Sequence, residues 1–237
     1  MRKRVVVSCG VGDRYEPYLA RLKDTVKRFS SIPIFSWSED WPIGSPTHRA
    51  MHYAFKIHAV KYAKESGYDS VLWLDAASYA TGPIEPVFER IERDGYFLST
   101  GVDILGQWIS DRALSHYGFT RDQAMHWKLP AGCIVGLDFQ HVLGRAFFWE
   151  WFEASKTGLF WSFHSEHAPD RMTSLYSDGP TKEAISSDPR CLGHRSDEAC
   201  FGLMMKCFGM KPTPIGDLFE GGLAKTVNGC IRSGYDL

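Results

Sequence analysis

The sequence predicts an α/β fold in which a mostly parallel central sheet carries helices on both faces. Across residues 1–101, short apolar runs alternate with segments of helical periodicity, and this alternation is typical of the β-α-β units that build parallel sheets. In addition, 44% of the 237 residues are hydrophobic and 23% are charged, so the chain can bury a large core and is not disordered. This length fits a single domain.

Strand and helix signals alternate from the N-terminus onward. Apolar, β-branched runs predict strands at Arg4–Ser8 and Ile32–Trp37. Between them, the apolar residues of Tyr15–Phe29 recur at helical spacing. A second helix is predicted over His48–Ser66, because one of its faces is apolar and Gly67 can end it.

The alternation continues through the centre of the chain. A short apolar strand is predicted at Ser70–Leu74, a helix at Ile84–Arg93 after Pro83, and a strand at Tyr96–Ser99. The elements expected beyond these are one or two short helices between Ile109 and His126, a strand at Gly132–Asp138, an aromatic helix at His141–Ala154, a long loop at Ser162–Arg190, a helix at Ser196–Phe208 and a late strand at Lys211–Ile215.

Composition narrows the classes of partner and compartment. The net charge is −1 and the basic residues are dispersed, which disfavours a nucleic-acid partner. The six cysteines include no C-x-x-C pair, which favours free thiols and a cytoplasmic location. The apolar run after Arg4 is too short for a secretory signal, and no stretch reaches the roughly 18–20 apolar residues of a membrane span. Aromatic residues make up 14%, which suits a core and also a cleft that stacks bases or sugar rings.

Asp75 is the most informative single residue. A buried apolar strand delivers it to the strand's carboxyl end, which is where ligands bind in open α/β sheets. A carboxylate at that point can hold a divalent ion on a diphosphate or accept a hydrogen bond from a ribose hydroxyl. The alternative is an acid that only caps a turn.

The segments around Asp75 resemble the centre of GT-A glycosyltransferases. The resemblance is carried by GYDSVLWLDA at 67–76 and GPIEPVFERI at 82–91. It implies a Rossmann-like, GT-A-like single domain over residues 1–237, with a nucleotide-binding half at 1–101 and an acceptor-side half at 102–237. In that family an Asp-x-Asp motif binds a nucleotide sugar through Mn²⁺ or Mg²⁺. Here Asp75 matches the first acid and Ala77 stands in place of the second, so metal binding by Asp75 is left open.

The resemblance also implies donor-binding residues in the first half. Lys56 lies on the helix before Asp75, where its charge could neutralise a diphosphate without a metal; the alternative is a solvated helix face. Arg49, next to His48, is expected to open that helix, whose N-terminus would attract phosphate. The remaining donor-side expectations are Gly10 in a Gly-x-Gly turn near the nucleobase, Tyr15 as a stacking ring, and Ser78 after the strand.

Two later segments resemble the acceptor side of the same family. LPAGCIVG at 129–136 is similar to a small-residue turn beside the acceptor, in which Gly132 allows close backbone approach. The run from His194 to Glu198 is similar to an acid-bearing motif that opens a late helix. There Asp197 or Glu198 would orient the acceptor hydroxyl or act as the general base. The alternative is a helix N-cap at Ser196, followed by acids that offset the helix dipole.

The expected activity is transfer of a sugar, of the hexosyltransferase type, from a nucleotide-sugar donor to a glycan or small-molecule acceptor. The absent second acid leaves open a non-catalytic protein that binds nucleotide or carbohydrate. A third alternative is a zinc-dependent hydrolase or deaminase, because the following residues supply ligand types at non-standard spacing: His164, Glu166, His167, Asp170, Cys191 and His194.

Overall fold

The structure of the chain is a computed structural model. It describes residues 2–161, 163–164, 185–214, 217–220 and 231–233. Of the predicted loop at 162–190, residues 162 and 165–184 therefore lie outside the described residues, as does Ile215 at the end of the expected late strand.

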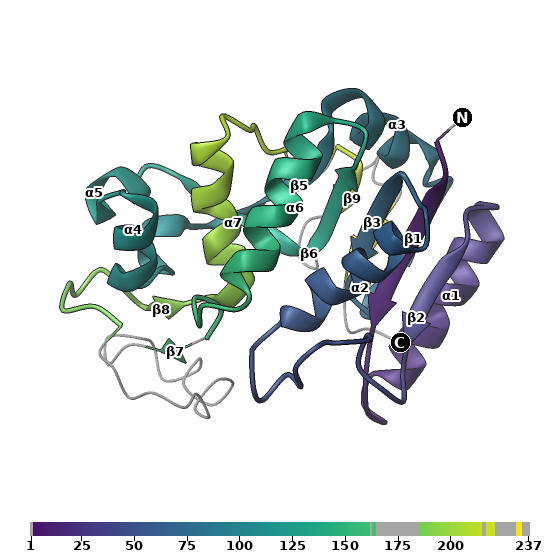
Figure 1. The fold of residues 1–237 in the computed structure, drawn as a ribbon, viewed down its shortest axis with the longest axis horizontal. Coiled ribbons are helices and arrows are strands. Elements are labelled where there is room, and N and C mark those ends of the chain that lie inside the picture. The colour runs from purple at the N-terminus through teal and green to yellow at the C-terminus, as the bar shows by residue number, and fades with distance from the viewer. Residues whose placement is uncertain (1, 162, 165–184, 215–216, 221–230, 234–237) are drawn as a thin grey trace.

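The centre of the structure is a five-stranded sheet in the order β2-β1-β3-β6-β5 (Figure 1). Its members are β1 (Arg4–Cys9), β2 (Ile34–Trp37), β3 (Ser70–Leu74), β5 (Tyr96–Ile104) and β6 (Lys128–Asp138). β1 pairs in parallel with both β2 and β3, whereas β6 runs antiparallel to β3 on one side and β5 on the other. Four of the five strands thus share one direction, and the predicted mostly parallel sheet is confirmed.

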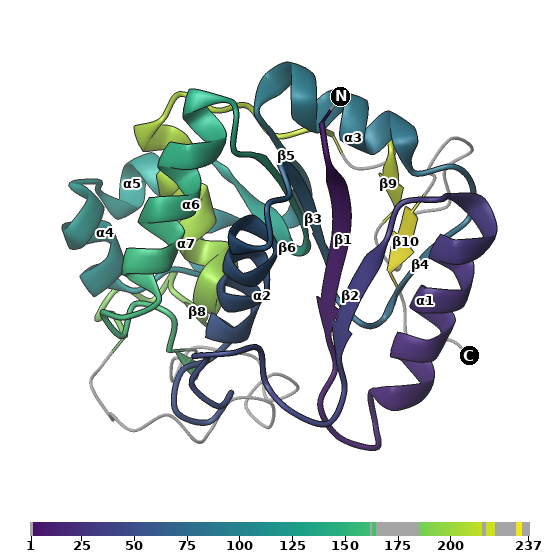
Figure 2. The ribbon, with the colours of Figure 1, turned by 45° about the vertical axis from the view of Figure 1, so that its right-hand side comes forward.

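Helices cover both faces of this sheet, as the alternation predicts (Figure 2). α1 (Glu16–Phe29) and α3 (Glu85–Asp94) pack on one face. α2 (Ala54–Glu65), α6 (Val142–Ala154) and α7 (Ser196–Cys207) pack on the other. Strand side chains alternate between the two resulting cores.

Shorter elements complete the described fold. Two helices, α4 (Asp111–Tyr117) and α5 (Arg121–Ala124), fall where short helices are expected, and a 3₁₀ turn, η1 (Leu105–Gln107), precedes them. Two small sheets have no counterpart among the elements predicted from the sequence. One joins β4 (Ser78–Ala80), β10 (Ile231–Ser233) and β9 (Phe219–Glu220), and the other pairs β7 (Phe163–His164) with β8 (Gly193–His194).

Two predicted elements differ in the structure. The helix expected from His48 begins only at Ala54, because Tyr53 has a left-handed backbone (φ 56°) and the residues before it form turns. The late strand is reduced to one bridge, between Thr213 and Ser99 of β5.

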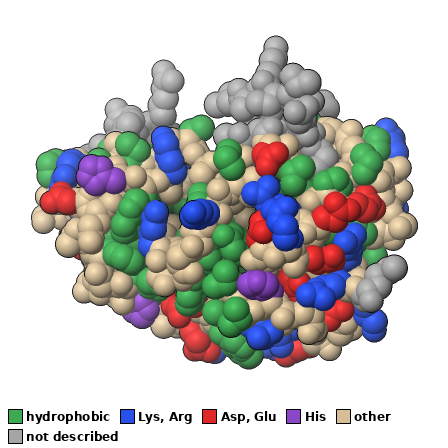
Figure 3. Space-filling model, turned by 90° about the horizontal axis from the view of Figure 1, so that it is seen from above, with side chains coloured by type: hydrophobic (Ala, Val, Ile, Leu, Met, Phe, Trp, Pro, Cys, Tyr) green, Lys and Arg blue, Asp and Glu red, His purple; other side chains and the backbone are tan. Residues whose placement is uncertain are grey.

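None of the described helices has the length and apolar character needed to cross a membrane. Basic and acidic side chains are interspersed on the face that lies uppermost in Figure 1 (Figure 3).

Candidate functional site

Asp75 stands at the carboxyl end of the central strand β3, as predicted. All five residues of β3 are buried, while the Asp75 side chain is 34% exposed. Its backbone N–H donates to the Cys133 carbonyl on β6 at 2.9 Å. The Trp73 indole N–H donates to Asp75 Oδ1 at 2.8 Å. The neighbouring strand thus fixes the backbone of Asp75, and an indole two residues back orients its carboxylate.

Lys56 of α2 joins three separate segments through its ammonium group. Its Nζ donates to the Gly132 carbonyl at 2.8 Å and lies 3.2 Å from Asp197 Oδ2 and 3.3 Å from Asp75 Oδ1. The contact with Gly132 is a hydrogen bond, and the two contacts with carboxylates are ion pairs. The residue is only 2% exposed. The interpretation of Lys56 as a solvated helix position is therefore wrong.

The surroundings of Lys56 keep it charged. Burial lowers the pKa of the ammonium, but the carboxylates of Asp197 and Asp75 outweigh burial and raise the pKa above its usual value. Two aromatic rings lie near Nζ, that of Tyr53 at 4.8 Å and that of Trp73 at 5.9 Å from the ring centroid. Rings at such distances attract a cation, so the ammonium is held by carboxylates and by aromatic faces.

Asp197 is the buried partner of Lys56. It is 1% exposed and lies in the first turn of α7. Burial raises the pKa of its carboxyl to about 7, against the opposing effect of Lys56. The 3.2 Å contact with the ammonium is an ion pair without good hydrogen-bond alignment at Oδ2. Asp197 thus holds Lys56 in place and cannot itself reach a dissolved ligand in this conformation.

Glu198 is the accessible acid of the pair. Its side chain is 29% exposed, and its Oε1 accepts the Gly132 N–H at 3.1 Å. Arg195 Nη1 lies 4.0 Å from its other oxygen. Partial burial raises the pKa of Glu198, and the charges of Lys56 and Arg195 oppose that rise. A carboxyl with a raised pKa and one free side is suited to accept a proton.

Gly132 makes the approach of Glu198 possible. A β-carbon at position 132 would lie 2.4 Å from Glu198 Cγ, well inside any real contact distance. Gly132 does allow a close approach to the backbone, but the group that approaches is the Glu198 side chain and not an acceptor. Its N–H binds Glu198 and its carbonyl binds Lys56, so one peptide segment of β6 positions both.

The helix that carries the two acids does not begin as expected. Arg195 is its N-cap residue, and Ser196 is the first helical residue, with φ of 42°. The Ser196 hydroxyl is buried and has no hydrogen-bond partner among the described residues. The N-cap interpretation of Ser196 is therefore wrong.

The other donor-side residues are placed unequally. A β-carbon on Gly10 would lie 2.9 Å from Ala76 Cβ and 3.0 Å from Tyr15 Cβ, so the turn after β1 packs against the residue that follows Asp75. Tyr15 is half-buried, whereas Ser78 is fully buried in β4. Arg49 is exposed in the turn that precedes Tyr53 and does not open α2. The reason for expecting phosphate at Arg49 therefore no longer holds.

His194 faces the protein interior instead of an acceptor. Its Nδ1 accepts the Ser110 N–H at 3.1 Å, which leaves Nε2 to donate to the Leu159 carbonyl at 2.6 Å. Burial lowers the pKa of His194 to about 4, in keeping with this neutral tautomer. Both ring nitrogens are used, so His194 is not available to a metal or an acceptor.

The zinc alternative therefore loses one ligand. Cys191 Sγ is buried beside the carbonyls of Ile109 and Gly193. Within the described residues, no three His, Cys, Asp or Glu side chains converge as a metal site would require. Three other proposed ligands, Glu166, His167 and Asp170, lie outside those residues, as does the side chain of His164.

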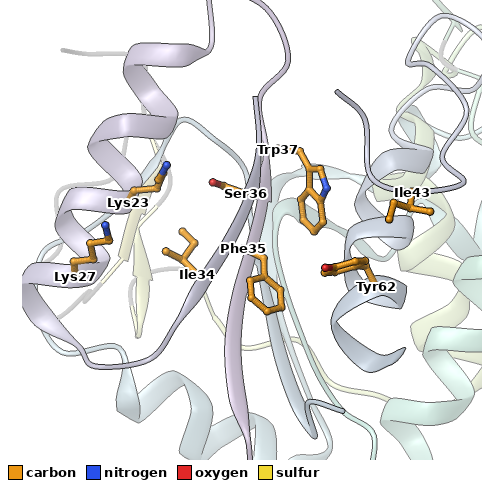
Figure 4. Close-up of a pocket in the computed structure, with 8 residues that line it drawn as sticks. All are labelled: Lys23, Lys27, Ile34, Phe35, Ser36, Trp37, Ile43 and Tyr62. Atoms are coloured by element: carbon orange, nitrogen blue, oxygen red, sulfur yellow. The ribbon is translucent and has the colours of Figure 1, made fainter. Parts of the chain in front are cut away.

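A separate cavity of about 390 Å³ lies at the free edge of the sheet, away from Asp75. In Figure 4 two lysines of α1 face it across the edge strand β2, with aromatic side chains on the other side. Its lining residues are Lys23, Lys27, Ile34, Phe35, Ser36, Trp37, Ile43 and Tyr62. It includes none of the predicted site residues.

Two residues next to Lys56 and Asp75, namely Trp73 and Tyr53, had not been singled out from the sequence. Trp73 could have been found, because residues i and i+2 of a strand share a face, which puts its indole on the side of Asp75. Tyr53 carries no local signal for a left-handed backbone, since such conformations are rare outside glycine. Its position became clear only from the fold.

The fold can be compared with solved structures. Mouse xyloside xylosyltransferase 1, in its apo form, superposes over 98% of this chain and 97% of its own, with a TM-score of 0.51 and 8% identity. The chain shares its fold with a glycosyltransferase. Two further matches are a glycosyltransferase involved in glycosylation of the major capsid of PBCV-1 (TM-score 0.42, 11% identity, 66% of this chain and 68% of that one) and the bifunctional glycosyltransferase WbbM (0.45, 10%, 66% and 35%). No family model and no curated protein matches the sequence.

Removal of the buried ammonium should be strongly destabilising. We expect Lys56→Met to lower the free energy of unfolding by about 3–5 kcal/mol, because it leaves the buried Asp197 carboxylate without its partner. The double variant Lys56→Met/Asp197→Asn should recover part of that loss. Lys61→Met on the same helix, which breaks an exposed pair with Glu65, should cost at most about 1 kcal/mol. Urea unfolding measures all four proteins, and equal losses for the two lysine variants would contradict the assignment.

The stability difference between Asp197→Asn and the wild type should depend on pH. Between pH 3.8 and about 7 the folded chain retains a proton on Asp197 that the unfolded chain has released, so this residue lowers stability as the pH rises through that window. His48 and His194, whose pKa values are lowered to about 4, act in the opposite direction, so only the difference between variants is informative.

The stability of Asp197→Asn relative to the wild type should therefore increase by about 1–4 kcal/mol between pH 4.5 and 7.5. Urea unfolding at the two pH values measures it. A flat difference for Asp197→Asn would contradict its raised pKa.

Proposed function

We propose that this protein is a glycosyltransferase that moves a sugar from a nucleotide-sugar donor to a carbohydrate or small-molecule acceptor. One observation carries the proposal. Two accessible carboxylates from distant parts of the chain are linked at the carboxyl end of the central strand: Lys56 pairs with Asp75 and binds the Gly132 carbonyl, and the Gly132 N–H binds Glu198. The shared fold with a glycosyltransferase supports the same conclusion.

The donor side of the site is assigned to Asp75. Its Oδ1 is engaged by Trp73 and Lys56, while its side chain keeps an exposed fraction of 34%. A carboxylate accepts hydrogen bonds, so the other oxygen of Asp75 would accept a hydrogen bond from a hydroxyl of the donor's ribose or sugar. The Gly10 turn, which packs on Ala76, would form the adjoining wall near the base.

The acceptor side is assigned to Glu198. The acceptor hydroxyl oxygen attacks the anomeric carbon, the bond from that carbon to the diphosphate oxygen breaks, and the hydroxyl proton passes to the Glu198 carboxylate. The nucleoside diphosphate leaves with the electron pair of the broken bond. Asp197 positions Lys56 below this surface and does not touch the substrates.

A second candidate function is binding without turnover. The specific observation in its favour is Ala77, a buried apolar residue where the family motif has its second acid. A bound donor that is never consumed, under any metal condition, would favour this alternative.

A panel of UDP-, GDP- and CMP-linked sugars tests donor binding by thermal shift. A ligand present at a hundredfold excess over its Kd stabilises the folded state by about 2.7 kcal/mol, which is about 5–10 °C in Tm for a chain of this size. We expect at least one donor to produce such a shift in the wild type and Asp75→Ala to abolish it. The exposed variant Asp24→Ala should keep it.

The two possible failures of this test are distinct. If none of the donors raises Tm, the proposed function is wrong. If a donor binds and Asp75→Ala leaves its affinity intact, the function stands and the site assignment is wrong.

Glu198→Gln should separate binding from chemistry. Glutamine keeps an oxygen for the Gly132 N–H but cannot act as a base. We expect donor binding to persist while transfer or hydrolysis of that donor falls about 10²–10⁴-fold. Retention of the full rate would exclude Glu198 as the proton acceptor.

A further inference from the structure

One oxygen of the carboxylate that a divalent cation would use is already engaged. Asp75 Oδ1 accepts a hydrogen bond from the Trp73 indole N–H at 2.8 Å and lies 3.3 Å from Lys56 Nζ. The second position of the motif is Ala77, which offers no side-chain oxygen, and its carbonyl accepts a hydrogen bond from Arg21 at 2.9 Å. Mn²⁺ and Mg²⁺ require several oxygen ligands with good geometry. Within the part of the chain that the structure describes, the side chains at this point therefore do not fit a divalent cation.

The Lys56 ammonium has the contacts that a bound cation would have. It bridges the carboxylates of Asp75 after β3 and Asp197 of α7, at 3.3 and 3.2 Å, and a carbonyl of β6 at 2.8 Å. Its positive charge would repel a dication that tried to share Asp75. From this geometry we infer that Lys56 takes the place of the metal ion and that the site binds its nucleotide-sugar donor without a divalent cation. The part of this inference that concerns the donor rests on the proposed function.

Backbone conformation supports a site built around this lysine. In the described part of the chain, Tyr53 and Ser196 are the non-glycine residues with positive φ, at 56° and 42°. Tyr53 is the N-cap of the helix that carries Lys56, and Ser196 directly precedes Asp197. Such conformations cost about 1–3 kcal/mol each and persist where the surrounding structure requires them. Here both occur at the helix starts that bring the ammonium and the carboxylate together.

The consequence concerns how Asp75 recognises a donor. The indole of Trp73 and the ammonium of Lys56 engage Oδ1 of Asp75, whose side chain is still partly exposed, so its other oxygen would be the one available to a donor. That oxygen would accept a hydrogen bond directly from a hydroxyl of the donor. Asp75 would then not contact the diphosphate through a metal ion.

The first test measures Mn²⁺ binding without any donor, by the loss of the electron paramagnetic resonance signal of free Mn²⁺. We expect the wild type to leave the signal unchanged. Ala77→Asp, which restores the second acid but keeps Lys56, should also leave it unchanged. Lys56→Met/Ala77→Asp should take up one Mn²⁺ per chain, with circular dichroism as the control for folding. Stoichiometric uptake by the wild type would overturn the inference, and so would uptake by Ala77→Asp alone.

A folded double variant that binds no Mn²⁺ would show that Lys56 does not occupy the cation's place. The wild-type measurement needs no variant, so it stands if the double variant does not fold. A second test uses the donor that raises Tm and compares the shift in EDTA with that in Mn²⁺. Equal shifts are expected, and a shift that requires Mn²⁺ would overturn the inference. Failure of every donor would refute the proposed function and leave the Mn²⁺ result intact.

Discussion

The described site depends on one buried positive charge. Moving an ammonium group out of water costs several kcal/mol even after relaxation, and only well-placed acceptors offset that cost. Lys56 has one hydrogen-bond acceptor and two ion-pair partners, and each belongs to a different segment: the Gly132 carbonyl on β6, Asp197 on α7 and Asp75 after β3. Because none of these contacts can be lost cheaply, the lysine fixes the relative positions of three segments that are far apart in sequence. The accessible carboxylates are positioned by these contacts, Asp75 by Lys56 directly and Glu198 through Gly132.

Much of the fold could be predicted from local patterns. Apolar periodicity is set by which face of an element is buried, so α1, α3, α6 and α7 were found close to their true limits. Strand direction and neighbours are not encoded in this way. Nothing in the sequence of β6 shows that it runs antiparallel between β3 and β5, and short strands such as β4, β9 and β10 are too brief to give a period.

Most residues of the candidate site could be predicted from the sequence, but the contacts between them could not. Asp75 was identified from its strand-end position, and Gly132 and the two acids of α7 from the resemblance to GT-A glycosyltransferases. The structure brings them together with Lys56. Burial decided the rest. Lys56 proved to be internal, Asp197 and Glu198 proved to differ in access, and His194 proved to be bonded to backbone on both nitrogens. Helical spacing alone cannot distinguish a lysine that faces solvent from one that faces a buried carboxylate.

The antiparallel position of β6 also bears on how the chain can fold during synthesis. In the central sheet β5 hydrogen-bonds to β6 and not to β3, so the gap between β3 and β5 stays open until residue 138 has left the ribosome. The N-terminal portion that carries Asp75 cannot complete its own sheet before then. While residues only up to about 104 have emerged, the edges of β3 and β5 that β6 later covers are unpaired, and unpaired strand edges promote aggregation.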